Sequence, residues 1–278
     1  MNLTFLAHSG FVIETQKAIL VFDYYQDPAH ILDRQLEGEK PCLFLVSHNH
    51  EDHWNQAILD YGKQNSGHCR YVLERAVAKT EAVQIGLAPD NYLTVEAGDR
   101  ITADQLKIPG LLTLNCYRSN DEGVAFLLET DEGFIYHAGD LNDWNWGDQD
   151  APYYERTYRE ELAKLQADLS GRRLAMAMVP VDHRLGDKAL SGAIIFAAMI
   201  QTDLLVPMHL NGDPDLPRKL AENMDTSCYF VREGVDKEGR PVVVTDVLYE
   251  GDLSRNRPGK PGAIMSLTQP GDRTSWPF

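Results

Sequence analysis

A chain of 278 residues with 43% hydrophobic content is long enough for one large domain or two small ones, and this excludes disorder as its default state. A formal net charge of −16, without any large block of Lys and Arg, argues against nucleic acid as a partner. Four scattered cysteines form no CxxC pair and no window approaches the roughly 18 apolar residues of a membrane span, so neither a zinc ribbon, a redox motif nor membrane insertion is expected.

The first third of the chain alternates strands with helices after an initial hairpin. In chain order we predict strands at 11–15, 18–23 and 42–46, a helix at 54–64, a strand at 71–74 and a helix at 75–86. The three residues 15–17 can form the turn between the first two strands.

The rest of the chain carries a second block of strands and helices. Short antiparallel strands are expected between 92 and 114, followed by a hairpin of strands 124–130 and 134–140. The later elements are a helix at 153–169, a strand at 174–182, a helix at 188–201, and strands at 203–209 and 241–252. Two such blocks predict two packed sheets with helices outside, in one domain over 1–253 with an irregular tail at 254–278.

Several of these apolar runs end in a side chain that can bind metal. The endings are Asp23, the cluster His48 to His53, Asp140, Asp182 and His209. Ligand-bearing residues at the ends of several strands are how an α/β layer assembles a site along one edge.

Residues 47–53, SHNHEDH, place three histidines and two acids directly behind the apolar run 42–46. Alternate side chains of an extended chain share a face, so His48 and His50 can present both imidazoles to one ion. Asp52 and His53, turning into the next helix, can face a neighbouring ion. Imidazole and carboxylate suit Zn, Mn, Fe or Ni, and the sequence does not choose among these metals.

HNHEDH, with the later HAGD at 137–140 and PMH at 207–209, resembles the metallo-β-lactamase superfamily of binuclear metal hydrolases. The resemblance implies a four-layer αββα sandwich of two mixed sheets with the metals at one edge. It also implies first-metal ligands His48 and His50, second-metal ligands Asp52, His53 and His209, and a bridging Asp140. The segments AHSGFVIET, YHAGD and VPVDHRLG are similar to the branch that includes L-ascorbate 6-phosphate lactonase-like proteins.

One departure from the family pattern concerns the first metal. The family usually supplies a third histidine just ahead of the strand that precedes the GD motif, and residues 115–129 contain none. Asp121 or Ser119 stands roughly at that place, and Asp121 is the better ligand because an ionised carboxylate both coordinates and neutralises a cation. Alternatively, Asp121 caps a turn with Glu122 and Gly123.

Other polar residues near these motifs have two interpretations each. His8 can reach the metals or a substrate, or make a structural hydrogen bond. His137 can orient a ligand or be a buried, satisfied histidine. By family precedent, Asp23 is a buried structural acid near the site. Asp182 and His183 can assist proton transfer, and the alternative for Asp182 is a salt bridge to Arg184. Three tryptophans beside the motifs can line an apolar pocket or pack in the core: Trp54, Trp144 and Trp146.

Taken together, these residues predict a hydrolase that acts on a small ester, lactone or phosphoester. Two divalent ions, zinc first with Mn, Fe or Ni as alternatives, would activate a water, with Asp52 orienting the nucleophile and Asp140 holding the pair. The rivals are an RNA or phosphodiester hydrolase of the same fold and a non-catalytic metal-binding sensor. We expect a small-molecule substrate, no nucleic-acid or membrane partner and a cytoplasmic location, and the sequence leaves a homo-oligomer open.

Overall fold

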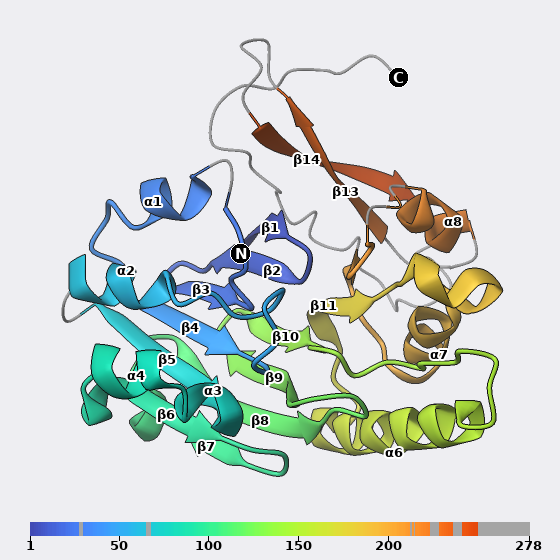
Figure 1. The fold of residues 1–278 in the computed structure, drawn as a ribbon, viewed down its shortest axis with the longest axis horizontal. Coiled ribbons are helices and arrows are strands. Elements are labelled where there is room, and N and C mark those ends of the chain that lie inside the picture. The colour runs from blue at the N-terminus through green and yellow to red at the C-terminus, as the bar shows by residue number, and fades with distance from the viewer. Residues whose placement is uncertain are drawn as a thin grey trace.

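The computed structural model of the chain describes residues 1–27, 30–64, 68–211, 213, 215–222, 228–235 and 241–249. Within these residues two β-sheets pack against each other, with helices on the outer sides (Figure 1). The tail predicted at 254–278, and residues 250–252 of the last predicted strand, lie outside the described residues.

The first sheet contains six strands in sequential order. They are β1 (Asn2–Ala7), β2 (Gly10–Glu14), β3 (Ile19–Phe22), β4 (Cys42–Val46), β5 (Cys69–Glu74) and β6 (Tyr92–Val95). β1, β2 and β3 pair antiparallel, whereas β3 to β6 pair parallel. Every residue of β3 and β4 is buried, as expected for parallel strands covered on both faces.

The second sheet contains eight strands in the order β14-β13-β12-β11-β10-β9-β8-β7. Their bounds are β7 (Arg100–Thr102), β8 (Leu111–Arg118), β9 (Val124–Thr130), β10 (Gly133–His137), β11 (Leu174–Pro180), β12 (Leu205–Met208), β13 (Cys228–Val235) and β14 (Pro241–Tyr249). β9 and β10 form the predicted hairpin, and β10 to β13 pair parallel. Both sheets are therefore mixed.

Helices lie against the outer face of each sheet, which confirms the predicted four-layer arrangement (Figure 1). Their bounds are α1 (Ile31–Gln35), α2 (Ile58–Gln64), α3 (Arg75–Ala78), α4 (Glu81–Gly86), α5 (Ala103–Leu106), α6 (Ala151–Leu169), α7 (Ser191–Met199) and α8 (Leu216–Glu222). α2 and α3 contact β5 of the first sheet, and α6 and α7 contact β8 and β11 of the second. Among the described residues, no helix combines the length and hydrophobicity that crossing a bilayer requires.

Two predicted helices differ from those observed. The helix predicted at 54–64 begins only at Ile58, because Trp54 donates its N–H to His50 O in a turn and Asn55 accepts a hydrogen bond from the Ala57 N–H. The helix predicted at 75–86 is divided into α3 and α4. Thr80 has an extended backbone and its hydroxyl caps the second of these helices, so the first one ends before it.

Two glycines let the loops of the second sheet approach the end of β4. Gly123 has φ +72°, and a Cβ atom there would lie 2.1 Å from Ser47 O. Gly139 has φ +51°, and a Cβ atom there would lie 2.7 Å from Val124 O. Both positions need glycine for its positive φ and for its lack of a side chain. The loops before β9 and after β10 are consequently held against Ser47, next to the histidine cluster.

Candidate metal centre

The polar residues predicted at strand ends converge at one edge of the two sheets. Asp23 follows β3 and Ser47 follows β4, while Asp140, Asp182 and His209 follow β10, β11 and β12. Because β3 and β4 are parallel neighbours, and so are β10 to β12, the carboxyl ends within each group meet at the same edge.

Three histidines turn Nε2 toward the carboxylate of Asp140. Nε2 of His48 lies 3.4 Å from Asp140 Oδ2, while Nε2 of His53 and of His209 lie 3.1 and 3.5 Å from Oδ1. All four side chains are buried. Residues more than 150 positions apart in the sequence thus form one compact cluster around the carboxylate predicted to bridge two ions.

Asp23 fixes the opposite side of two of these rings. Its carboxylate is fully buried and accepts the Ser47 N–H at 2.8 Å, the Ser47 hydroxyl at 2.6 Å and His53 Nδ1 at 2.7 Å. Since the Ser47 hydroxyl donates to Asp23, its oxygen is left to accept from His48 Nδ1 at 2.9 Å. Burial alone would raise the pKa of Asp23, but the nearby His137 and His53 outweigh it and lower that pKa. Asp23 therefore holds both imidazoles with Nε2 toward Asp140.

Asp182 does the same for His209. It is fully buried and accepts His209 Nδ1 at 3.0 Å and Asn211 Nδ2 at 2.8 Å. It also forms the salt bridge to Arg184 that the sequence suggested, with Nε at 2.9 and 3.0 Å from its two oxygens. Burial would raise the pKa of Asp182, but His209 and Arg184 outweigh it and keep the carboxylate ionised. Asp182 thus both pairs with Arg184 and orients the His209 ring.

His50 lies on the more exposed side of the cluster. Its Nδ1 is 2.9 Å from His48 Nε2, so the two imidazoles of the HxH pair do present nitrogens to one point. Its other nitrogen, Nε2, lies 3.4 Å from Glu122 Oε2. Sequence reasoning did not assign Glu122 to the site. The only available signal was its position beside Asp121, in the loop where the third histidine was expected.

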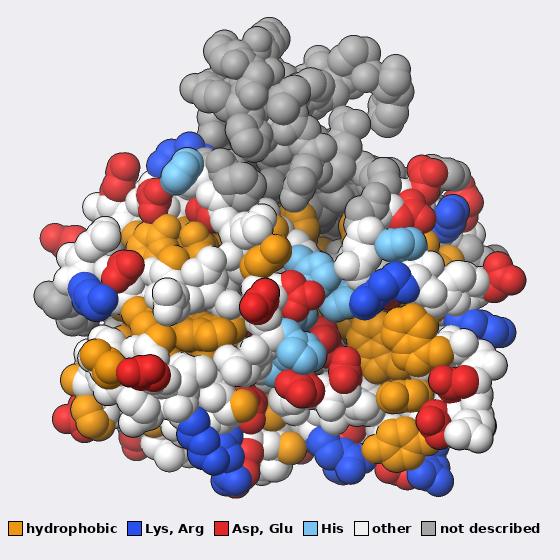
Figure 2. Space-filling view, viewed as in Figure 1, with side chains coloured by type: hydrophobic (Ala, Val, Ile, Leu, Met, Phe, Trp, Pro, Cys, Tyr) orange, Lys and Arg blue, Asp and Glu red, His pale blue; other side chains and the backbone are white. Residues whose placement is uncertain are grey.

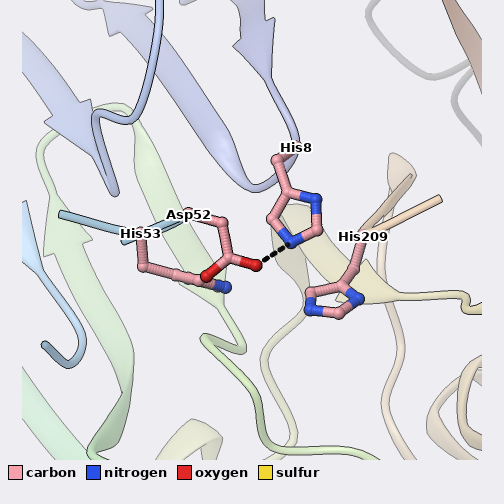
Figure 3. A group of neighbouring side chains, drawn as sticks. All are labelled: His8, Asp52, His53 and His209. Carbon is pink, nitrogen blue, oxygen red and sulfur yellow. Dashed lines mark ion pairs between the residues drawn. The ribbon is translucent and has the colours of Figure 1, made fainter. Parts of the chain in front are cut away.

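Asp52 and His8 complete the other side of the cluster, beside His53 and His209 (Figure 3). His8 Nε2 lies 3.2 Å from Asp52 Oδ2, and this contact helps hold the pKa of Asp52 well below its usual range. His8 has φ 55° and His209 has φ 62°, both in the left-handed region. The His209 N–H donates to His8 O at 3.1 Å, which secures this unusual backbone pairing.

The side chains fall into three overlapping groups whose ligand atoms lie within 4.8 Å of one another. The groups are His8, Asp52, His53 and His209; Asp23, His48 and His53; and His48, His50 and Asp140. His53 Nε2 and Asp140 Oδ1 are buried and 3.1 Å apart, but are not aligned for a hydrogen bond. Such unpaired buried atoms are costly, and a cation between them would satisfy both. The donor set and these two atoms therefore fit divalent metal ions.

The remaining predicted residues are less closely tied to the cluster. Asp121 is exposed, and its pKa is raised by desolvation and by the charge of Asp140. Its carboxylate is therefore within electrostatic reach of the group formed by His48, His50 and Asp140 without belonging to it. His183 is exposed, with Nδ1 3.3 Å from Leu210 O, and belongs to none of the three groups.

His137 is buried and satisfied by backbone groups. Its Nε2 donates to Ser9 O at 2.9 Å, and Nδ1 accepts the Gly139 N–H at 3.1 Å, an arrangement that needs a neutral ring. Burial lowers the pKa of His137, in agreement with the neutral form. The ring also stacks on Phe22, so it shapes the turn that delivers Asp140.

Comparison with known proteins adds the family to this geometry. A family profile described as a Beta-lactamase superfamily domain matches residues 2–150, more than half of the chain. The chain belongs to the metallo-β-lactamase superfamily. Two proteins named UPF0173 metal-dependent hydrolase are similar to this chain. The protein from Desulfitobacterium hafniense is 29% identical over 77% of this chain and 85% of its own length. The protein from Korarchaeum cryptofilum is 25% identical over 81% of this chain and 90% of its own length.

Solved structures show the same superfamily fold. Igni18, a metallo hydrolase from Ignicoccus hospitalis, has a TM-score of 0.57 at 18% identity and covers 87% of this chain and 97% of its own. CmlA, a diiron β-hydroxylase from Streptomyces venezuelae, has a TM-score of 0.50 at 11% identity and covers 75% of this chain and 44% of its own. These likenesses concern the metallo-β-lactamase fold, and the chemistry must be argued from the residues at the site.

Proposed function

We propose that this protein is a binuclear metal-dependent hydrolase that acts on a small ester, lactone or phosphoester. The observation that carries the proposal is the convergence of three Nε2 atoms on Asp140, each ring held from behind through its Nδ1. Side chains arranged in this way are oriented to bind cations before any cation arrives, because each imidazole is held with its Nε2 toward Asp140.

The proposed ligands divide into two sets that share Asp140. His48, His50 and Asp121 belong to the first ion, and Asp52, His53 and His209 to the second. Zinc is the first expectation, with Mn, Fe or Ni as alternatives for this donor set. Two divalent ions held there would supply acidification of water and polarisation of the scissile bond.

The chain's own residues orient the reacting groups. Asp52 is partly exposed and kept ionised, so it can accept a hydrogen bond from the nucleophile and hold it in line. His8, whose pKa is lowered by burial, is a neutral imidazole whose Nε2 lies 3.2 Å from Asp52 Oδ2, so it can hold that carboxylate in place. Asp182 is fully engaged by His209 and Arg184, which leaves His183 as the other candidate for proton transfer.

Metal analysis and a substrate panel test this proposal together. The purified protein is expected to bind two zinc equivalents and to hydrolyse at least one member of a panel of esters, lactones, phosphodiesters and RNA. His50→Ala is expected to lose one equivalent and most of the activity. His30→Ala serves as the matched control, because His30 is an exposed histidine that pairs only with Asp33 within the described part of the chain.

Each other outcome favours a named rival or contradicts the proposal. One equivalent or none, without turnover, favours a sensor, whereas RNA as the preferred substrate favours a nuclease. A loaded protein that hydrolyses no member of the panel, with His50→Ala behaving identically, contradicts catalysis.

A further inference from the structure

Two stacked tryptophans border the metal centre on the side of His209. Trp144 is buried, donates its Nε1–H to Asp140 O at 2.8 Å, and meets the His209 ring edge to face at 5.6 Å. Trp146 stacks on Trp144 with ring centroids 6.0 Å apart and an interplanar angle of 6°. Trp146 is 46% exposed, so its ring is accessible to a ligand. The centre is therefore adjoined by an accessible aromatic surface.

Arg184 stands beside this surface. Its Cζ lies 5.8 Å from the centroid of the Trp146 ring, close enough for a cation–π contact. Nε and Nη2 donate to Asp182, whereas Nη1 has no partner among the residues that the structure describes. The side chain is 49% exposed. One edge of the planar guanidinium can therefore receive a carboxylate or phosphate in bidentate fashion.

The charges around the centre make this arginine distinctive. The partly exposed Asp52 and the exposed Glu122 border the histidines. Figure 2 shows Asp and Glu side chains around the histidines, and on one side a basic side chain and a hydrophobic patch lie next to each other beside them. The charges of Asp140 and Asp52 both act on Arg184, which places its guanidinium within electrostatic reach of the centre. Arg184, a cation held next to the aromatic face of Trp146 at the rim of an acidic site, suits a ligand with a negatively charged group on a planar or apolar body.

We propose that Arg184 and Trp146 form a substrate subsite that binds a carboxylate or phosphate group carried on a planar or apolar body, with the scissile bond over the metal centre. The subsite rests on the proposed hydrolytic function for its role in turnover. Its binding chemistry does not depend on turnover and can be measured separately.

Paired substrates test the role in turnover. The ester 4-acetoxybenzoate and its methyl ester share one acetyl ester bond and differ in one negative charge. In the zinc-loaded protein, Arg184→Gln is expected to lower the ratio of their kcat/KM values, anionic over neutral, by about 10- to 100-fold, the effect of one charged hydrogen-bond pair. The ratio is the readout because any disturbance of Asp182 acts on both substrates alike. Arg173→Gln, which loses a comparable Asp pair at the other end of β11, is expected to leave the ratio unchanged.

Calorimetry separates the subsite from the hydrolysis. Benzoate, phenylphosphonate and uncharged benzyl alcohol are titrated into zinc-loaded protein and into the variants, with zinc content measured in each. The anions are expected to bind more tightly than the alcohol, and Arg184→Gln is expected to remove that advantage. Trp146→Ala, at an exposed side chain that is not one of the proposed metal ligands, is expected to weaken the binding of all three compounds.

The outcomes distinguish the two proposals. If no ester is hydrolysed but Arg184→Gln removes the preference for anions, the proposed ester hydrolysis fails and the subsite stands. If benzoate and phenylphosphonate bind Arg184→Gln as tightly as the unaltered protein, the anions bind the metal ions and the subsite is wrong. The subsite is equally wrong if the kcat/KM ratio is unchanged by Arg184→Gln. Whichever anion binds more tightly identifies the preferred group.

Discussion

The sharpest test of the metal centre is Asp23→Asn, because Asp23 contacts no ion in the proposed assignment and acts only through other residues. One of its oxygens, Oδ2, accepts both the Ser47 hydroxyl at 2.6 Å and His53 Nδ1 at 2.7 Å. The other, Oδ1, accepts the Ser47 N–H at 2.8 Å. An asparagine amide must direct its NH₂ group at one of these sets of donors, so every orientation leaves a buried donor facing a donor.

The magnitude follows from these bonds. If the amide NH₂ replaces Oδ2, two charge-assisted hydrogen bonds are lost at about 1.5–3 kcal/mol each, or about 3–6 kcal/mol in all. That is a large part of the stability of a typical domain. His53 can recover by moving its proton to Nε2, but Nε2–H then points at Asp140 and is no longer a ligand. Loss of a carboxylate behind a ligating histidine typically weakens metal binding by about 10- to 100-fold.

Two measurements check this prediction, urea unfolding of the metal-free protein and zinc competition against a chromophoric chelator. Asp33→Asn is the matched control, since Asp33 also pairs with a histidine, His30, at 2.9 Å, but on the exposed surface. The control is expected to lose at most about 1 kcal/mol of its free energy of unfolding and to keep its zinc affinity. If Asp23→Asn binds two zinc equivalents with the affinity of the unaltered protein, the idea that Asp23 fixes the His53 tautomer is refuted.

Three further changes have definite expected results. Glu122→Gln is expected to weaken zinc binding at the first site several-fold with little change at the second, because Glu122 pairs with His50, a proposed ligand of the first ion. Stepwise zinc titration measures both sites. Gly123→Ala is expected to lower the free energy of unfolding by about 2–4 kcal/mol, since the new Cβ meets Ser47 O. Gly98→Ala, also at positive φ but with open space around it, is expected to lower it by only about 1 kcal/mol, and thermal unfolding compares the two variants. In the metal-free protein the charges of Asp140 and Asp23 overcome burial and raise the pKa of His53 to about 10, so a cation must displace a proton at neutral pH. Zinc affinity should therefore rise with pH, by at most about tenfold per pH unit, and an affinity that does not change with pH contradicts the assignment. The stability that protonated His53 gives to the metal-free protein is lost as the pH rises through about 10.

The sequence predicted the strands that deliver the site because each is a short apolar run followed by a polar residue. β4 and β12 are buried throughout, so their sequences read as continuous apolar stretches, and His48 and His209 stand out at their ends. β1 was not predicted, and neither were α1, α8 and β13. α1 is a single short helix preceded by His30, whose backbone lies in the left-handed region, and no periodic pattern can develop over five residues.

The residues that hold the ligands from behind were harder to assign than the ligands. Asp182 could be matched to Arg184 because they are two positions apart, but its bond to His209 spans 27 positions and depends on the parallel pairing of β11 and β12. Glu122 has no pattern at all, since a loop acid has no preferred partner until the loop is placed. Its contact with His50 exists only because Gly123 lets that loop lie against Ser47.

The fold alone does not choose between hydrolysis and other metal chemistry, since a β-hydroxylase has a similar fold. The choice must come from what surrounds the ions. An acidic chain with a net charge of −16 would repel an anionic substrate at long range. Two divalent ions, however, would offset the negative charge of the carboxylates that hold them. At short range, Arg184 then presents the edge of its guanidinium that does not face Asp182, beside Trp146. Added salt should therefore raise the association rate of an anionic substrate, by screening the distant repulsion more than the contact with Arg184.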